Sequence, residues 1–199
     1  MCSGCLLLVH SKRTLSDIIR FLPLSSEAVL LDRNTANPIL SISKDGNSVK
    51  QGVYQVLPDT PERFNSLPCV LATKGISSGK HYWEVQILDE QCEDCNPSIW
   101  IMGVAKKSVK RKGKVYTTSD EGIWVLQWIN FYQGGLSVPF DVMSAKTKPN
   151  LLGLYLDYEA GSITFYNAGN GKHLYNITDT FGEQVFPIFC TTNSVELKM

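Results

Sequence analysis

Short stretches of alternating apolar and polar residues follow one another along most of the chain. In residues 82–88, Trp83, Val85 and Ile87 alternate with polar neighbours, which is the period of two expected of a half-buried strand. Residues 99–104 are continuously apolar, which indicates a strand covered on both faces. Further strands are expected at residues 29–31, 39–42, 70–72, 123–129, 151–156, 163–166, 174–177 and 185–190.

Turn signals separate these strands, and a helical pattern is confined to the N-terminal end. Gly-containing turns are expected at residues 45–47, 78–79, 159–161 and 169–171. Residues 14–22 place four apolar side chains on one helical face, and Pro23 ends that helix. Many short strands without intervening helices predict an all-β fold, an antiparallel two-sheet sandwich with a short N-terminal helix. We expect an N-terminal segment over residues 1–27 and one domain over residues 28–199.

Composition excludes some classes of protein and partner. The chain has 199 residues, 43% of them hydrophobic, which is enough for one buried core. Lys+Arg and Asp+Glu both number 19, so no overall charge attracts nucleic acid. No apolar run approaches the roughly 18 residues that span a bilayer. The apolar run at residues 5–9 is too short for a secretory signal and lacks a basic flank, which favours the cytosol.

Ser77 lies at the centre of a G-x-S-x-G match, the spacing of a hydrolase nucleophile elbow. An elbow needs a strand before the serine and a helix after it. A strand pattern follows Ser77 instead, and no recognisable motif supplies an acid or a base. We therefore expect Ser77 to be a turn residue and the chain to be no enzyme.

Six cysteines offer two pairs with C-x-x-C spacing, Cys2–Cys5 and Cys92–Cys95. Four thiolates could hold zinc, but the pairs are far apart and no histidine pattern supports them. We expect neither a metal nor a cofactor. Cys69 and Cys190 lie in apolar runs and are expected to be small core residues.

Three landmarks resemble those of the PRY-SPRY family. They are Leu31-Asp32-Arg33, Trp83-Glu84-Val85 and the hairpin LDYE at residues 156–159, with LPDTPERFNSLPCVL (57–71) and SGKHYWEV (78–85) between them. The resemblance covers roughly residues 28–190 and implies a bent antiparallel sandwich whose variable loops bind proteins. Arg33 replaces the usual proline of the first landmark, and the loop at residues 89–98 is longer than usual. The hairpin acids are expected to satisfy local backbone N–H groups.

The family implies two settings for the protein. It includes free-standing reptile venom vespryns (ohanin-like proteins), and SVKRKG (108–113) and DTFGEQVFPIF (179–189) are similar to vespryn segments. That likeness implies a secreted venom toxin that acts on an unknown receptor. The alternative is a cytoplasmic, tripartite-motif or butyrophilin-like domain that recognises a cytosolic protein or a phosphorylated metabolite. His81 and Arg111 match positions around the basic metabolite pocket of butyrophilins.

Two stretches carry candidate partner-binding residues. Six basic residues fall within residues 106–114, which is either a solvated loop or a patch for an anionic partner. Aromatic residues follow Trp124, which matches a core tryptophan of the family, and they are either core residues or anchors for a partner. The predicted site comprises Lys110, Arg111, Lys112, Trp128, Phe131 and Tyr132. We expect a protein partner, a monomer and no nucleic acid, and the one glycosylation sequon, Asn176-Ile177-Thr178, matters only if the chain is secreted.

Overall fold

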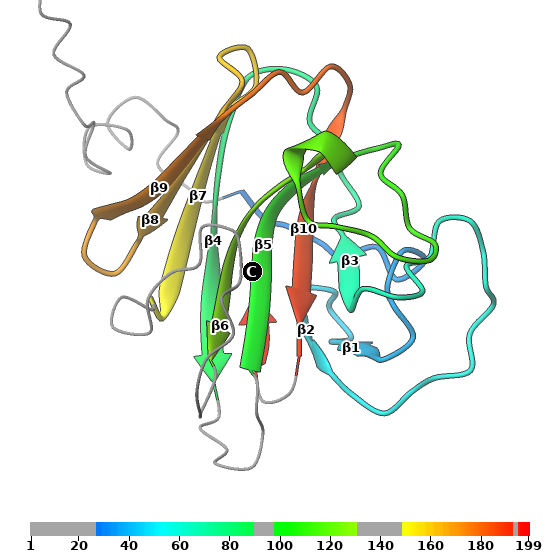
Figure 1. Cartoon of the computed structure of the whole chain (residues 1–199). Coiled ribbons are helices and arrows are strands. Elements are labelled where there is room, and N and C mark those ends of the chain that lie inside the picture. The colour runs from blue at the N-terminus through cyan, green and yellow to red at the C-terminus, as the bar shows by residue number, and fades with distance from the viewer. Residues whose placement is uncertain (1–26, 90–97, 131–148, 193–194) are drawn as a thin grey trace, which may run out of the picture.

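The computed structural model describes residues 27–89, 98–130, 149–192 and 195–199. Within these ranges the chain forms two antiparallel sheets that face each other (Figure 1), which confirms the predicted sandwich. The expected helix at residues 14–22 and most of the long loop at 89–98 lie outside the described residues. No helix of the described part has the length and apolar character that crossing a membrane would require.

The larger sheet has seven strands and the smaller sheet four. In spatial order the larger sheet contains β1 (Leu40–Ile42), β2 (Ser48–Gln51), β11 (Val195–Lys198), β4 (Lys80–Asp89), β7 (Leu151–Asp157), β8 (Ser162–Asn167) and β9 (Lys172–Thr178). The smaller sheet contains β3 (Cys69–Leu71), β10 (Val185–Thr191), β5 (Ser98–Lys106) and β6 (Ile123–Asn130). A 3-10 turn, η1 (Ser119–Glu121), precedes β6.

Two strands of the larger sheet were not predicted. These strands, β2 and β11, are four residues long. Only two residues of each strand are buried. The predicted strand at residues 29–31 is reduced to one bridge, in which Leu31 pairs with Ala72. The extended conformation of these short segments is therefore determined by pairing with neighbouring strands rather than by their own sequence pattern.

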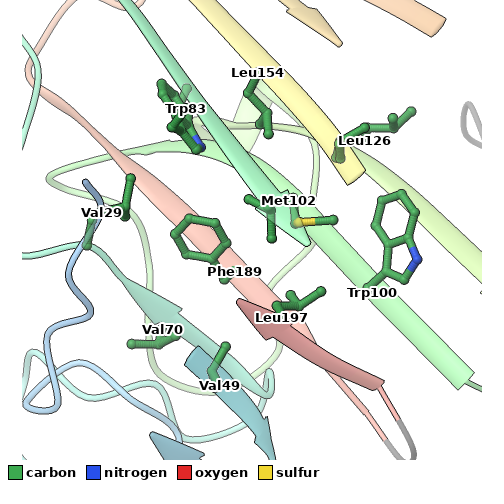
Figure 2. Close-up of a cluster of buried hydrophobic side chains, with 14 of the residues drawn as sticks. Val29, Val49, Val70, Trp83, Trp100, Met102, Leu126, Leu154, Phe189 and Leu197 are labelled. Carbon is green, nitrogen blue, oxygen red and sulfur yellow. The ribbon is translucent and has the colours of Figure 1, made fainter. Parts of the chain in front are cut away.

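The main core fills the space between the two sheets. Trp83, Val85 and Ile87 point into it from β4, which confirms the face predicted from their spacing. Figure 2 shows Trp83 and Leu154 from the larger sheet lying across from Met102 and Phe189 of the smaller sheet.

A second apolar cluster covers the outer face of the smaller sheet. Phe64, Val109 and Val115, which come from connecting segments, pack there against Ala105 and Ile188. The strand β5 therefore has apolar packing on both faces, as its continuous apolar sequence predicts. The connecting segments that form the candidate site are anchored by this cluster.

A disulfide joins Cys69 of β3 to Cys190 of β10. The two residues are direct partners in the antiparallel ladder, and both are buried in the second cluster. The prediction that they are small core residues is right about their burial and wrong about their chemistry, because neither is a free thiol. The register between two strands that are 121 residues apart creates this bond.

Candidate functional site

The segment that follows β2 carries a run of exposed apolar side chains. Val53 is 87% exposed and Val56 97%, with Tyr54 at 68% and Leu57 at 37%. Backbone bonds hold the segment in place, since Gly52 N–H donates to the Ile39 carbonyl (2.8 Å) and Gln55 N–H to the Pro38 carbonyl (2.9 Å). Such apolar exposure in an ordered segment is typical of an interaction surface.

A buried arginine fixes the far end of this segment. Arg63 is only 6% exposed. Its guanidinium donates to the carbonyl oxygens of Pro58 (2.9 Å), Arg33 (3.0 Å) and Ala36 (2.8 Å). A buried cation must have its donors satisfied, and three backbone carbonyls do this here. The apolar run therefore lies between two fixed points.

The basic run lies on a second segment that packs against the first. Asn65 N–H donates to the Arg111 carbonyl (3.1 Å), and Gly113 N–H donates to Asn65 Oδ1 (2.9 Å). Lys112 Nζ forms an ion pair with Asp59. In Figure 1 the loop after β2 and the loop after β5 lie on the same side of the molecule as β3. We call residues 53–59 and 107–114 together the two-loop surface.

The three predicted basic site residues have different roles. The Arg111 guanidinium donates to the carbonyls of Glu62 (3.1 Å) and Lys107 (2.9 Å), and its partial burial lowers its pKa from the ordinary value. Lys112 is engaged by Asp59. Lys110 is exposed and forms no ion pair with any residue of the described ranges. Arg111 and Lys112 therefore hold the two segments together, and Lys110 projects to solvent.

Of the predicted aromatic site residues, only Trp128 lies within the described ranges, and it does not join this surface. Trp128 is 3% exposed and stacks on Trp100 in the core, with ring centroids 6.3 Å apart. Core packing, one of the two interpretations of its sequence, is what the structure shows for Trp128. Phe131 and Tyr132 lie outside the described residues.

The chain leaves β5 and β6 at opposite ends of their paired ladder. Asn130 pairs with Ser98 at one end, and Ile123 pairs with Ala105 at the other. Seven residues at about 3.3 Å each put those two ends roughly 23 Å apart. The chain leaves β5 toward Lys110 at one end and leaves β6 toward Phe131 at the other.

Ser77 is an exposed residue of the segment that leads into β4. The strand β4, and not a helix, follows it, as predicted. Both ring nitrogens of His81 face acceptors, Nδ1 the Glu27 carboxylate and Nε2 the Ser78 carbonyl, each at 2.8 Å. Both ring nitrogens of His81 are therefore directed at partners other than the Ser77 hydroxyl, and these partners differ from those of Arg111, the other residue that matches the butyrophilin pocket.

The prediction that the acids of the LDYE hairpin satisfy local backbone N–H groups is confirmed for Asp157 and wrong for Glu159, whose partner lies 80 residues away in the chain. The Glu159 carboxylate accepts the Gly79 N–H with both oxygens, at 2.8 and 3.0 Å. Asp157 accepts the Ala160 N–H (3.1 Å) and pairs with Lys80 (3.4 Å). Among the residues that the structure describes, no group of three or more His, Cys, Asp or Glu side chains is arranged to hold a metal. The paired Cys2–Cys5 and Cys92–Cys95 lie outside those residues.

Sequence reasoning missed the apolar half of the two-loop surface. The run VYQVL at residues 53–57 stands between Gly52 and Pro58 and carries no charge. Gly and Pro commonly mark turns and loops. An apolar run between them therefore indicates an exposed loop with a binding role.

Comparison with known families accounts for nearly the whole described chain. Residues 29–76 match the SPRY-associated domain (PRY), and residues 80–199 match the SPRY domain. Butyrophilin subfamily 2 member A2 of Homo sapiens is 40% identical over 163 residues, which is 81% of this chain and 30% of that protein. The E3 ubiquitin-protein ligase TRIM11 of Rattus norvegicus is 38% identical over 168 residues, 83% of this chain and 34% of that protein. The chain spans about a third of these relatives.

Two solved structures share the fold. The stonustoxin structure superposes with a TM-score of 0.68 at 26% identity, over 87% of this chain and 27% of that one. The TRIM65 PSpry domain superposes with a TM-score of 0.64 at 21% identity, over 91% and 93% of the two chains. SPRY and PRY segments together form a protein-interaction module. The chain belongs to the PRY-SPRY family.

Proposed function

We propose that the chain is a non-enzymatic binding module that engages a protein partner through the two-loop surface. The main support for this proposal is the apolar run at residues 53–57. It is exposed, and yet backbone hydrogen bonds and Arg63 hold it in place. A fixed loop loses little conformational entropy when it binds, so the apolar area that it buries contributes to affinity. Tyr54 supplies the kind of large side chain that dominates interface energies.

The charge of the second segment indicates the partner. Lys107 and Lys110 are exposed on that segment, while Arg111 and Lys112 are engaged within the surface. Exposed cations at the rim of an interface speed association with an acidic partner and add little to its affinity. We propose a partner that presents an apolar patch bordered by Asp or Glu.

We propose Phe131 and Tyr132 as contacts of a second region, distinct from the two-loop surface. They follow β6, whose last residue pairs with Ser98 at the far end of β5 from Lys106. Aromatic side chains on loops bury large areas at low entropy cost. A partner that reached both regions would have to span the smaller sheet.

We propose that the protein acts outside the cytosol, as a secreted, vespryn-like venom component. The Cys69–Cys190 disulfide supports export, because such bonds persist in oxidising compartments and are rare in the cytosol. The likeness to stonustoxin also supports a toxin. The identity to butyrophilin and TRIM proteins favours the second candidate, an intracellular domain that recognises a cytosolic protein or a phosphorylated metabolite.

The binding proposal is tested with an array of purified extracellular protein domains. The labelled chain is applied beside Val56→Asp, Tyr54→Ala and a control, Leu30→Asp, which changes an exposed apolar residue outside the two-loop surface. We expect the wild type and the control to bind the same array proteins. The two loop variants should bind those proteins with at least tenfold lower affinity. Array proteins that all variants bind with unchanged affinity would show that the binding surface lies elsewhere on the molecule. Mass spectrometry of the mature N-terminus and of the Cys69–Cys190 peptide pair separates export from cytosolic residence.

A further inference from the structure

The sequon Asn176-Ile177-Thr178 lies on β9, at the outer edge of the larger sheet. An acceptor asparagine must have Ser or Thr two positions later and no proline between. Asn96-Pro97-Ser98 is excluded by its proline, so Asn176 carries the one usable sequon. The side chains of Asn176 and Thr178 are both exposed, so the completed fold leaves this position open.

The hydrogen bonds of Asn176 leave its amide nitrogen free to carry a sugar. Its Oδ1 accepts from the hydroxyls of Thr164 (2.7 Å) and Ser162 (3.1 Å), which stand on the adjacent strand β8. Its Nδ2 has no hydrogen-bond partner among the described residues. Two neighbouring hydroxyls therefore fix the orientation of the amide and turn its nitrogen away from the sheet.

The position of β9 allows a bulky modification without blocking the two-loop surface. β9 and β1 form opposite edges of the seven-stranded sheet. Six strand spacings of about 4.8 Å put these edges roughly 29 Å apart, and Figure 1 shows β9 on the opposite side of the molecule from the loop after β2. An unpaired edge is also a site of unwanted strand pairing, which a glycan at Asn176 would cover.

The disulfide is an independent sign of the compartment in which asparagine is glycosylated. Cys69 and Cys190 are bonded in the second apolar cluster. Oxidative pairing of this kind belongs to the secretory route, where N-linked glycans are also added to surface loops and strands. The disulfide and the sequon, which lie on different sheets, are thus both consistent with passage through the secretory route.

We propose that Asn176 is an N-glycosylation site of the exported protein. The co-reactant is an oligosaccharide linked to a lipid through a diphosphate. The Asn176 Nδ2 forms a bond to C1 of the first sugar, the C1–O bond to the diphosphate breaks, and the lipid diphosphate leaves with the bonding electrons. One amide proton passes to a base. The inference rests on the export part of the proposed function and is independent of the binding surface.

The test expresses the full chain in cultured animal cells, once with its own N-terminus and once behind an added cleavable secretion leader. Treatment with an amidase that removes N-linked glycans is followed by gel mobility and intact mass. We expect one glycan in the wild type and in Thr178→Ser, and none in Thr178→Ala or Asn176→Gln. Thr178→Ala leaves the Asn176 hydrogen bonds intact, so a folded and unmodified product is expected.

Each outcome of this test has a defined meaning. A secreted but unmodified wild type behind the leader would overturn the acceptor site and leave the binding proposal standing. A chain that is modified only behind the leader, and that stays unmodified with its own N-terminus, would overturn the inference by removing export. Modification in both arms, lost in Thr178→Ala, supports both the site and export. An unchanged glycan in Asn176→Gln would place the modification elsewhere.

Discussion

At the scale of single residues, a hydrogen bond to an indole fixes one aromatic group of the core. Trp124 Nε1 donates to Asp179 Oδ2 at 2.7 Å, and the Phe181 ring meets Trp124 edge-on with centroids 4.9 Å apart. The Trp124 bond, together with the Thr180 N–H, lowers the pKa of Asp179 below 3.8. The carboxylate therefore stabilises the fold only while it is ionised.

This pair predicts an acid-dependent loss of stability. A lowered folded-state pKa contributes stability that is present above the unfolded-state pKa and lost as the pH falls through the folded-state value. Asp179→Asn should therefore be less stable than wild type at pH 7, and the difference should shrink below about pH 4. Urea unfolding at several pH values measures it. A difference that did not shrink as the pH fell would exclude a charge effect, and Asp120→Asn on η1 is the control.

A second residue-scale prediction concerns the opening strand pattern. Trp83 is 1% exposed within the main core, so Trp83→Ala should cost roughly 3–5 kcal/mol, as large core aromatics do. Gln86→Ala, on the exposed face of the same strand, should change stability by less than about 0.5 kcal/mol. Denaturant unfolding compares them, and equal midpoints for the two variants would contradict the register of β4.

At the scale of elements, β3 depends on its partner more than on its own sequence. It is three residues long and pairs with β10 alone. The disulfide across that pair closes a loop of 121 residues and restricts the unfolded chain. The short strand is thereby tied to the centre of the smaller sheet.

The disulfide should therefore contribute measurably to stability. Reduction, or the double substitution Cys69→Ala with Cys190→Ala, should lower the free energy of unfolding by about 2–5 kcal/mol. Alanine avoids placing a polar group in the apolar cluster. Guanidinium unfolding with and without reductant is the measurement. A reductant that destabilised the double variant equally would assign the effect to other cysteines.

The same elements show what the sequence reveals and what it does not. β4 and β5 were predicted because their apolar positions repeat clearly, whereas the polar four-residue strands β2 and β11 take their conformation from neighbours. The Cys69–Cys190 bond follows from the register of β3 on β10, which chain spacing does not encode. Trp128 has the same local signal whether it packs in a core or contacts a partner, and only the fold distinguishes the two.

At the scale of the whole molecule, the distribution of charge should affect how fast a partner associates more than how tightly it binds. Net charge is zero, so no long-range field of the whole chain attracts a partner. The exposed cations Lys107 and Lys110 instead make a local positive field on the second segment of the two-loop surface. Fields of this kind act mainly on association rates and weaken as salt rises.

Charge reversal at Lys110 should therefore change kinetics. Lys110→Glu should slow association with an acidic partner several-fold and reduce its dependence on salt, with a smaller effect on dissociation. Surface plasmon resonance at two salt concentrations, with a partner from the ectodomain array, measures both rates. Lys172→Glu, on the distant strand β9, is the control. Equal effects in both variants would assign the change to net charge.

The position of β11 decides how the two named segments of the family relate during folding. Among the described strands, β11 lies between β2 and β4, and β3 is held by β10, so two of the three PRY strands, β2 and β3, pair with the last strands of SPRY. Neither sheet is complete until β10 and β11 have docked. Such long-range pairings fold slowly and together. We therefore expect PRY and SPRY to be two sequence segments of one cooperative unit, and a cut before β11 would leave both β2 and β4 with open edges.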